Sequence, residues 1–307
     1  MKKTSLIPSV FLLIAASIGA QDSIQPETSP THRPFSVNVD LVELHVAVVD
    51  GTGRPIGGLG QQNFKIKENN ILQPITVFKH EDLPVSLGLV VDNSRSIEPR
   101  KARLDAAALS FVDKSNPEDE TFIIHFDSEV RLSRSFTHDR MSLHHDLAGA
   151  KPYGETALYD AIMTGLDTMN EASYSKKALL VITDGIDNRS QSTLEQVVAR
   201  ASRDDVMIFP VGLLSQSGGL KAEDSLIKIA EATGGRAYFP QTPEEARIMI
   251  DLIAKDLREQ YTIAYLPTNV LRDGRWRSVR VELEAPKGYP KDLQMTYRHG
   301  YYAPEVP

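Results

Sequence analysis

Oxygen-bearing side chains follow two apolar segments of the sequence, each at the point where the segment ends. The first run, 85–91, is followed by Asp92, Ser94 and Ser96, so that an aspartate and two hydroxyls stand at alternate positions. The second run, 178–183, is followed by Asp184. Carboxylates and hydroxyls in such a pattern are ligands that hard cations prefer in proteins.

A further hydroxyl lies between the two runs, in a Gly-Glu-Thr loop just before a helical pattern. The complete set has five oxygen-bearing side chains and two formal negative charges: Asp92, Ser94, Ser96, Thr156 and Asp184. It suits Mg²⁺ with several retained waters, and Mn²⁺ and Ca²⁺ are the alternative cations. Taken singly, Ser-x-Ser is often a helix cap and Asp-Gly is often a turn. Their placement at the ends of two buried strands is what favours a metal site.

The elements that must position these residues form a repeating pattern. The run 85–91 is almost continuously apolar, as expected of a strand buried on both faces. Further strand patterns at 121–126, 178–183 and 206–211 alternate with helical stripes, for example Leu104, Ala107, Ala108, Phe111 and Val112. This alternation predicts an α/β fold with a doubly wound, mostly parallel sheet flanked by helices. In open sheets of this kind, ligands bind outside the carboxyl ends of the strands.

Two helix starts carry capping signals. Ser192 and Glu195 have the spacing of a capping box, and Thr242 precedes Pro243 at the start of the last helix. That helix has an apolar stripe through Ile250, Ile253 and Leu257, among others.

Alternating apolar residues on both sides of the helical region predict β structure there. The N-terminal β segment is 35–82, the α/β domain 83–258 and the C-terminal β segment 259–307. We expect the two β segments to pack together as a β-sandwich into which the α/β domain is inserted. The rival arrangement is two independent small β modules, each of which would bury little surface.

The first twenty residues are typical of a targeting segment. Lys2 and Lys3 precede an apolar stretch of about 13 residues, which is shorter than the roughly 20 that a spanning helix needs. We expect residues 1–20 to be a cleaved signal peptide and 21–34 a flexible leader, so that no transmembrane segment remains after cleavage. The alternative is an uncleaved membrane anchor. Cleavage predicts a secreted or periplasmic protein.

The composition excludes several classes of function. Lys and Arg number 34 and Asp and Glu 41, so the formal charge is 34 − 41 = −7, which argues against a nucleic-acid partner. The chain has no cysteine, which excludes disulfides, thiolate metal sites and cysteine nucleophiles. His138, His144 and His145 lie close in sequence, but no carboxylate at zinc-ligand spacing accompanies them, and an exposed helical segment is the better interpretation.

Taken together, Asp92-x-Ser94-x-Ser96, the Thr156 loop and Thr183-Asp184-Gly185 resemble the metal-ion-dependent adhesion site of von Willebrand factor type A domains. The resemblance covers about 83–258, and the flanks are similar to bacterial secreted proteins, particularly of the acidobacterial type. It implies that Asp92, Ser94, Ser96 and Thr156 act on the cation directly or through water, often with Asp184 one layer further out. Arg95 stands where these domains commonly have a small residue. It would lie at the edge of the site, where it would either influence which partner docks or be a solvated surface residue.

These observations predict a non-enzymatic, Mg²⁺-dependent protein-binding or adhesion module. A partner's Asp or Glu carboxylate would complete the coordination of the cation. A metal-dependent hydrolase is the first alternative, with Glu155 or Asp187 as the visible general bases, although Asp187 also suits a loop cap. The second is a structural envelope protein in which the cation only stabilises the fold.

Overall fold

The computed structural model describes residues 41–148, 151–184, 186–213 and 219–305. The expected signal peptide (1–20) and leader (21–34) lie outside the described residues, as does the start of the N-terminal β segment at 35–40. Among the described residues, no helix combines the length and the apolar character needed to cross a membrane.

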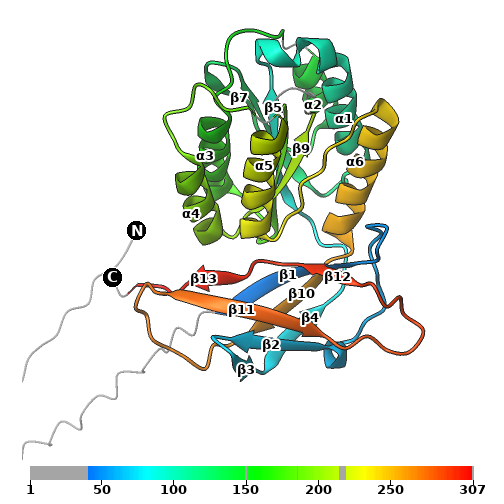
Figure 1. Cartoon of the computed structure of the whole chain (residues 1–307), viewed down its shortest axis with the longest axis vertical. Coiled ribbons are helices and arrows are strands. Elements are labelled where there is room, and N and C mark those ends of the chain that lie inside the picture. Colours follow the sequence, from blue (N-terminus) through cyan, green and yellow to red (C-terminus); the bar gives the residue numbers. More distant parts are fainter. Residues whose placement is uncertain (1–40, 149–150, 185, 214–218, 306–307) are drawn as a thin grey trace, which may run out of the picture. The chain divides into compact units, whose positions relative to one another are not determined.

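The central sheet has five strands in the order β7-β6-β5-β8-β9 (Figure 1). Strand β5 pairs in parallel with β6 and β8, β8 pairs in parallel with β9, and only the edge strand β7 runs antiparallel to its neighbour β6. The strand bounds are β5 (Ser86–Asp92), β6 (Glu120–Phe126), β7 (Val130–Thr137), β8 (Lys177–Thr183) and β9 (Met207–Gly212). The predicted mostly parallel sheet is therefore confirmed, and the antiparallel edge is an addition to it.

Helices cover both faces of this sheet (Figure 1). Alternate residues of β5 explain why, because Leu89 and Val91 pack with α1, α2 and α6, whereas Val90 packs with α3, α4 and α5. The helix bounds are α1 (Lys101–Lys114), α2 (Arg140–Ala148), α3 (Leu158–Thr168), α4 (Leu194–Asp204), α5 (Gly219–Thr233) and α6 (Pro243–Arg258), with 3₁₀ turns η1 (Gln61–Asn63), η2 (Arg95–Arg100) and η3 (Met169–Glu171). The predicted apolar stripe of α1 is buried throughout.

The capping signals are confirmed at α6 and shifted at α4. Thr242 Oγ1 accepts a hydrogen bond from Glu245 N at 3.1 Å, with Pro243 in the first turn. At α4 the cap is Thr193, one residue later than predicted, because Thr193 and Gln196 exchange both bonds of the capping box.

The two β segments at the ends of the chain form two antiparallel four-stranded sheets. Their orders are β12-β1-β10-β4 and β13-β11-β2-β3, so each sheet contains strands from both ends of the sequence. The bounds are β1 (Val42–Val49), β2 (Phe64–Glu68), β3 (Ile71–Gln73), β4 (Ile75–Lys79), β10 (Tyr261–Tyr265), β11 (Trp276–Leu283), β12 (Gln294–Thr296) and β13 (Gly300–Tyr302). A single core joins the sheets, with Leu44 and Tyr261 from one and Ile66 and Val281 from the other. The β-sandwich with an inserted α/β domain is therefore the fold of this chain.

A buried histidine lies in β1 of the sandwich. The Nδ1 atom of His45 is 3.4 Å from Thr262 Oγ1, and its Nε2 atom is 3.5 Å from a Glu43 carboxylate oxygen. Burial, together with the smaller effect of the charges of Lys176 and Arg298, lowers the pKa of His45 to about 3. The imidazole is therefore neutral in the folded protein at neutral pH.

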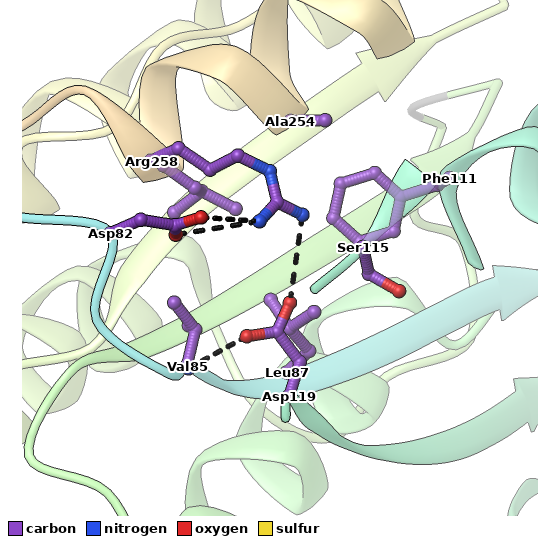
Figure 2. Close-up of a pocket in the computed structure, with 9 residues that line it drawn as sticks. Asp82, Val85, Leu87, Phe111, Ser115, Asp119, Ala254 and Arg258 are labelled. Carbon is purple, nitrogen blue, oxygen red and sulfur yellow. Dashed lines mark hydrogen bonds and ion pairs between the residues drawn. The ribbon is translucent and has the colours of Figure 1, made fainter. Parts of the chain in front are cut away.

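The chain enters and leaves the α/β domain at residues that form an ion pair. Arg258, the last residue of α6, lies 3.1 Å from Asp82 Oδ2 and donates a hydrogen bond to Lys114 O at 2.7 Å. Figure 2 shows its guanidinium between Asp82 and Asp119, beside a cavity of about 10 Å³ that has room for about one water. These contacts hold the end of α6 against the end of α1.

Candidate functional site

The five predicted oxygen-bearing residues lie at the carboxyl end of the parallel sheet. Asp92 is the last residue of β5, and Ser94 and Ser96 follow it, Ser96 within η2. Asp184 directly follows β8, the strand next to β5. Thr156 stands in the loop before α3. The main chain therefore brings both carboxylates to the same edge of the sheet.

Asp92 is completely buried and held by two donors. Its Oδ1 atom accepts a hydrogen bond from the Ser94 N–H at 2.8 Å, and its Oδ2 atom accepts one from the Thr183 hydroxyl at 2.7 Å. The Ser94 and Ser96 hydroxyl oxygens are 2.9 Å apart. The carboxylate and the two hydroxyls of the predicted motif are therefore neighbours in space.

The loop that carries Thr156 is tied to the loop that carries the serines. Tyr153 N donates to Asn93 O at 2.8 Å, and Arg95 N donates to Gly154 O at 3.1 Å. These two main-chain bonds place Thr156 near the serines.

Asn188 holds Thr156 from the other side. Its Oδ1 atom accepts a hydrogen bond from Thr156 N at 2.8 Å, and its own N–H donates to Thr156 O at 3.1 Å. The loop after β8 thus contributes Asp184 at one point and supports Thr156 at another.

The electrostatics of the site are unfavourable without a positive charge. Burial raises the pKa of Asp92 to about 6, and the neighbouring Asp184 carboxylate also raises it, although the hydrogen bonds from Ser94 and Thr183 lower it. In the part of the chain that the structure describes, neither carboxylate has an ion-pair partner among the Lys, Arg and His side chains, and the buried Asp184 Oδ1 atom has no hydrogen-bond donor. A buried acceptor of this kind calls for a water or an ion.

The donor set fits a hard cation by its chemistry. Across residues 41–148, 151–184, 186–213 and 219–305, no three His, Asp or Glu side chains converge on one point. The candidate set instead combines two carboxylates with three hydroxyls, which matches the oxygen ligands of Mg²⁺ and leaves room for water. A bound dication would favour the ionised form of both carboxylates.

The other residues singled out in the sequence have different roles. Asp187 Oδ2 accepts a hydrogen bond from Tyr159 N at 3.0 Å and another from the Ser190 hydroxyl at 2.5 Å, so Asp187 caps the first turn of α3. The histidines contact separate partners. His138 Nδ1 lies 3.0 Å from Asp119 O, and His144 Nε2 lies 2.7 Å from Asp113 Oδ1.

The sequence interpretation assigned no role to two supporting residues. Thr183 donates to Asp92, and Asn188 accepts from the Thr156 backbone. Thr183 is the first residue of the Thr-Asp-Gly motif, so its position was visible in the sequence, but its partner was not. Asn188 carries no local signal that distinguishes it from an ordinary loop residue.

Comparisons with known proteins support the type of domain. Residues 87–186 match the family model described as von Willebrand factor type A domain, which supports a domain of this type in the chain. The match runs from β5 to just beyond β8 and contains all five candidate residues. No curated protein matches the chain at a significant level.

Solved structures with low sequence identity also match. An aerotolerance-related membrane protein from Bacteroides fragilis NCTC 9343, with multiple mutations to serines, is 18% identical, with a TM-score of 0.46, covering 55% of this chain and 98% of that one. The vWF domain of the type V pili tip protein Mfa5 from Porphyromonas gingivalis is 14% identical, with a TM-score of 0.48, covering 58% and 95%.

Proposed function

We propose that this protein is a Mg²⁺-dependent protein-binding or adhesion module without enzymatic activity, acting outside the cytoplasm. The observation that carries the proposal is the pair of buried carboxylates, Asp92 and Asp184, one with an oxygen that lacks a hydrogen-bond donor. They lie beside two hydroxyls at the carboxyl edge of the sheet, where open α/β sheets bind ligands. The von Willebrand factor type A match over the same residues supports an interaction role.

Each candidate residue has a part in the proposed binding. Asp92, Ser94, Ser96 and Thr156 would hold the cation directly or through water, and Asp184 would balance its charge and orient bound water. Bound Mg²⁺ supplies a positive centre that attracts an oxygen anion. With Asp92 as the one carboxylate in direct contact and neutral hydroxyls and water as the other ligands, the cation keeps an exchangeable water position, which a partner's Asp or Glu can take.

The hydrolase alternative has little support from the residues near the site. A general base must be free to reach the proton that it removes. Asp187 is engaged by Tyr159 and Ser190, and the exposed Glu155 lies 3.8 Å from Arg189. We therefore propose binding rather than hydrolysis.

The direct test is calorimetric titration of Mg²⁺ into chelator-stripped protein. We expect saturable binding at one site in the wild type, loss of binding in Asp92→Ala and weakened binding in Thr156→Ala. Thr164→Ala is the control, because it also removes a threonine hydroxyl, which here bonds to Asp160 O on α3, away from the candidate site. Circular dichroism checks that each variant folds.

Two outcomes would contradict the proposal. Wild-type protein that takes up no Mg²⁺ or Mn²⁺, or Asp92→Ala protein that binds as tightly as the wild type, would rule out the site as described. Metal binding that raises thermal stability while no carboxylate ligand binds in a Mg²⁺-dependent way would favour a structural role for the cation.

A further inference from the structure

Exposed side chains lie in the loops that carry the candidate residues. We call this set the rim; it comprises Arg95, Lys151, Tyr153, Ile186 and Arg189. Arg95 lies between the two serines, Tyr153 N bonds to Asn93 O, and Arg189 follows Asn188, which bonds to Thr156. A partner that reaches the site with one carboxylate must therefore lie on the rim.

Two large apolar side chains of the rim face solvent. Tyr153, three residues before Thr156, is 67% exposed. Ile186, two residues after Asp184, is 42% exposed. Exposed aromatic side chains beside a binding site are typical anchors of protein interfaces, because they bury a large area at a small entropic cost. The rim therefore offers apolar contact next to the site.

The charge of the rim is positive, in contrast to the net charge of −7 for the whole chain. Arg95 and Lys151 are exposed, and no ion pair to either is found within the described ranges. Arg189 shares the nearby Glu155 carboxylate at 3.8 Å. Charges at the edge of an interface mainly select partners of opposite charge and speed their encounter. The complementary partner is acidic.

We propose that the rim docks an acidic segment of a protein partner that carries two carboxylates and an apolar side chain close together. One carboxylate reaches the cation site, and this part rests on the proposed function. The second pairs with Arg95 or Lys151, and the apolar side chain packs on Tyr153 and Ile186. This arrangement distinguishes the partner from any protein that merely exposes a single Asp or Glu.

The probe for this proposal is a library of random dodecapeptides displayed on phage and selected on the purified protein in Mg²⁺. We expect the selected peptides to be enriched in sequences with two acidic residues near a Leu, Ile, Phe or Tyr. For the best peptide, synthesised and measured in solution, we expect Arg95→Glu to weaken binding about tenfold, as reversal of an interface charge does. Tyr153→Ser should weaken it about fivefold or more through loss of the apolar anchor.

Two matched variants lie in the β-sandwich, away from the rim. Lys287→Glu reverses an exposed lysine to which the described residues form no ion pair, and Leu271→Ser removes an apolar side chain that is 63% exposed. Both should bind the peptide as the wild type does. Calorimetric Mg²⁺ titration should still show one saturable site in Arg95→Glu and Tyr153→Ser, because neither side chain belongs to the candidate donor set.

The outcomes separate this inference from the proposed function. Three outcomes would overturn the docking proposal: no peptide is enriched, the enriched peptides lack acidic or apolar residues, or the rim variants bind within twofold of the sandwich controls. The Mg²⁺ titration reports on the cation site independently of these outcomes. Acidic peptides that bind equally well in chelator and to Asp92→Ala would support the rim but contradict the cation-dependent function.

Discussion

Replacing Thr183 by valine tests the support that the structure assigns to Asp92. Valine has nearly the shape of threonine but no hydroxyl, so Asp92 Oδ2 loses the 2.7 Å bond that it accepts from Thr183. Both residues are completely buried, and a hydrogen bond to a charged group contributes about 1.5–3 kcal/mol. We expect the free energy of unfolding in chelator to fall by about 2 kcal/mol, which at roughly 2–4 °C per kcal/mol lowers Tm by about 4–8 °C.

The same variant should also weaken cation binding. Residues that orient a metal ligand without touching the metal typically change affinity by about 10- to 100-fold when they are replaced, so calorimetric titration should show a Mg²⁺ affinity lower by that factor. Thr164→Val is the control, because its hydroxyl bonds to a backbone carbonyl on α3 at 2.9 Å. It should lose stability without losing Mg²⁺ affinity.

The reasoning would be refuted by a particular pattern of results. If Thr183→Val binds Mg²⁺ as tightly as the wild type, the hydroxyl does not orient Asp92 for the cation, whatever its effect on stability. If the variant is as stable as the wild type in chelator, the buried hydrogen bond contributes nothing measurable to the fold.

Two further predictions concern stability. Because the pKa of His45 is lowered from 6.5 to about 3 in the fold, its contribution is complete above pH 6.5 and is lost as the pH falls toward 3. Urea denaturation in chelator should show that the free energy of unfolding falls by about 2 kcal/mol more in the wild type than in His45→Gln between pH 7.5 and pH 5. Equal losses in the two proteins would contradict this prediction. Gly154→Ala should reduce stability by about 1–3 kcal/mol and exceed the cost of Gly288→Ala, to be compared by thermal melting. Both glycines have positive φ, but only at Gly154 would the new Cβ lie 2.4 Å from Ser128 Oγ, so similar losses would rule out crowding as the cause.

Much of the fold could be predicted because its signals are local. Apolar runs at 85–91 and 178–183 are typical of strands buried on both faces, and the structure buries β5 throughout. Helix α5 was not predicted, although Leu226, Ile229 and Ala230 are buried at helical spacing, so a usable signal was present. Strand β7 is a different case, because it lies at the edge of the sheet and exposes much of its length, which weakens the apolar pattern.

The candidate site also has residues that local sequence signals reveal and contacts that they do not. Asp92, Ser94, Ser96 and Asp184 are recognisable from their positions after buried strands, and these positions depend only on where each strand ends. Their assignment as cation ligands stays a prediction. The bond from Thr183 to Asp92 could not be predicted, because it requires β5 and β8 to be neighbours in a register that pairs Val91 with Ile182.

The sequence by itself therefore determined the types and order of most of the elements, with α5 and β7 as the exceptions, and the oxygen-bearing residues at their ends, since burial periodicity and turn chemistry act over a few residues. Only the tertiary structure decided which strands lie side by side, that both ends of the chain share one sandwich core, and that Arg95 and Tyr153 stand together at the site. Strand pairing depends on contacts between segments far apart in the chain, and a local pattern carries no information about which segment will be its neighbour.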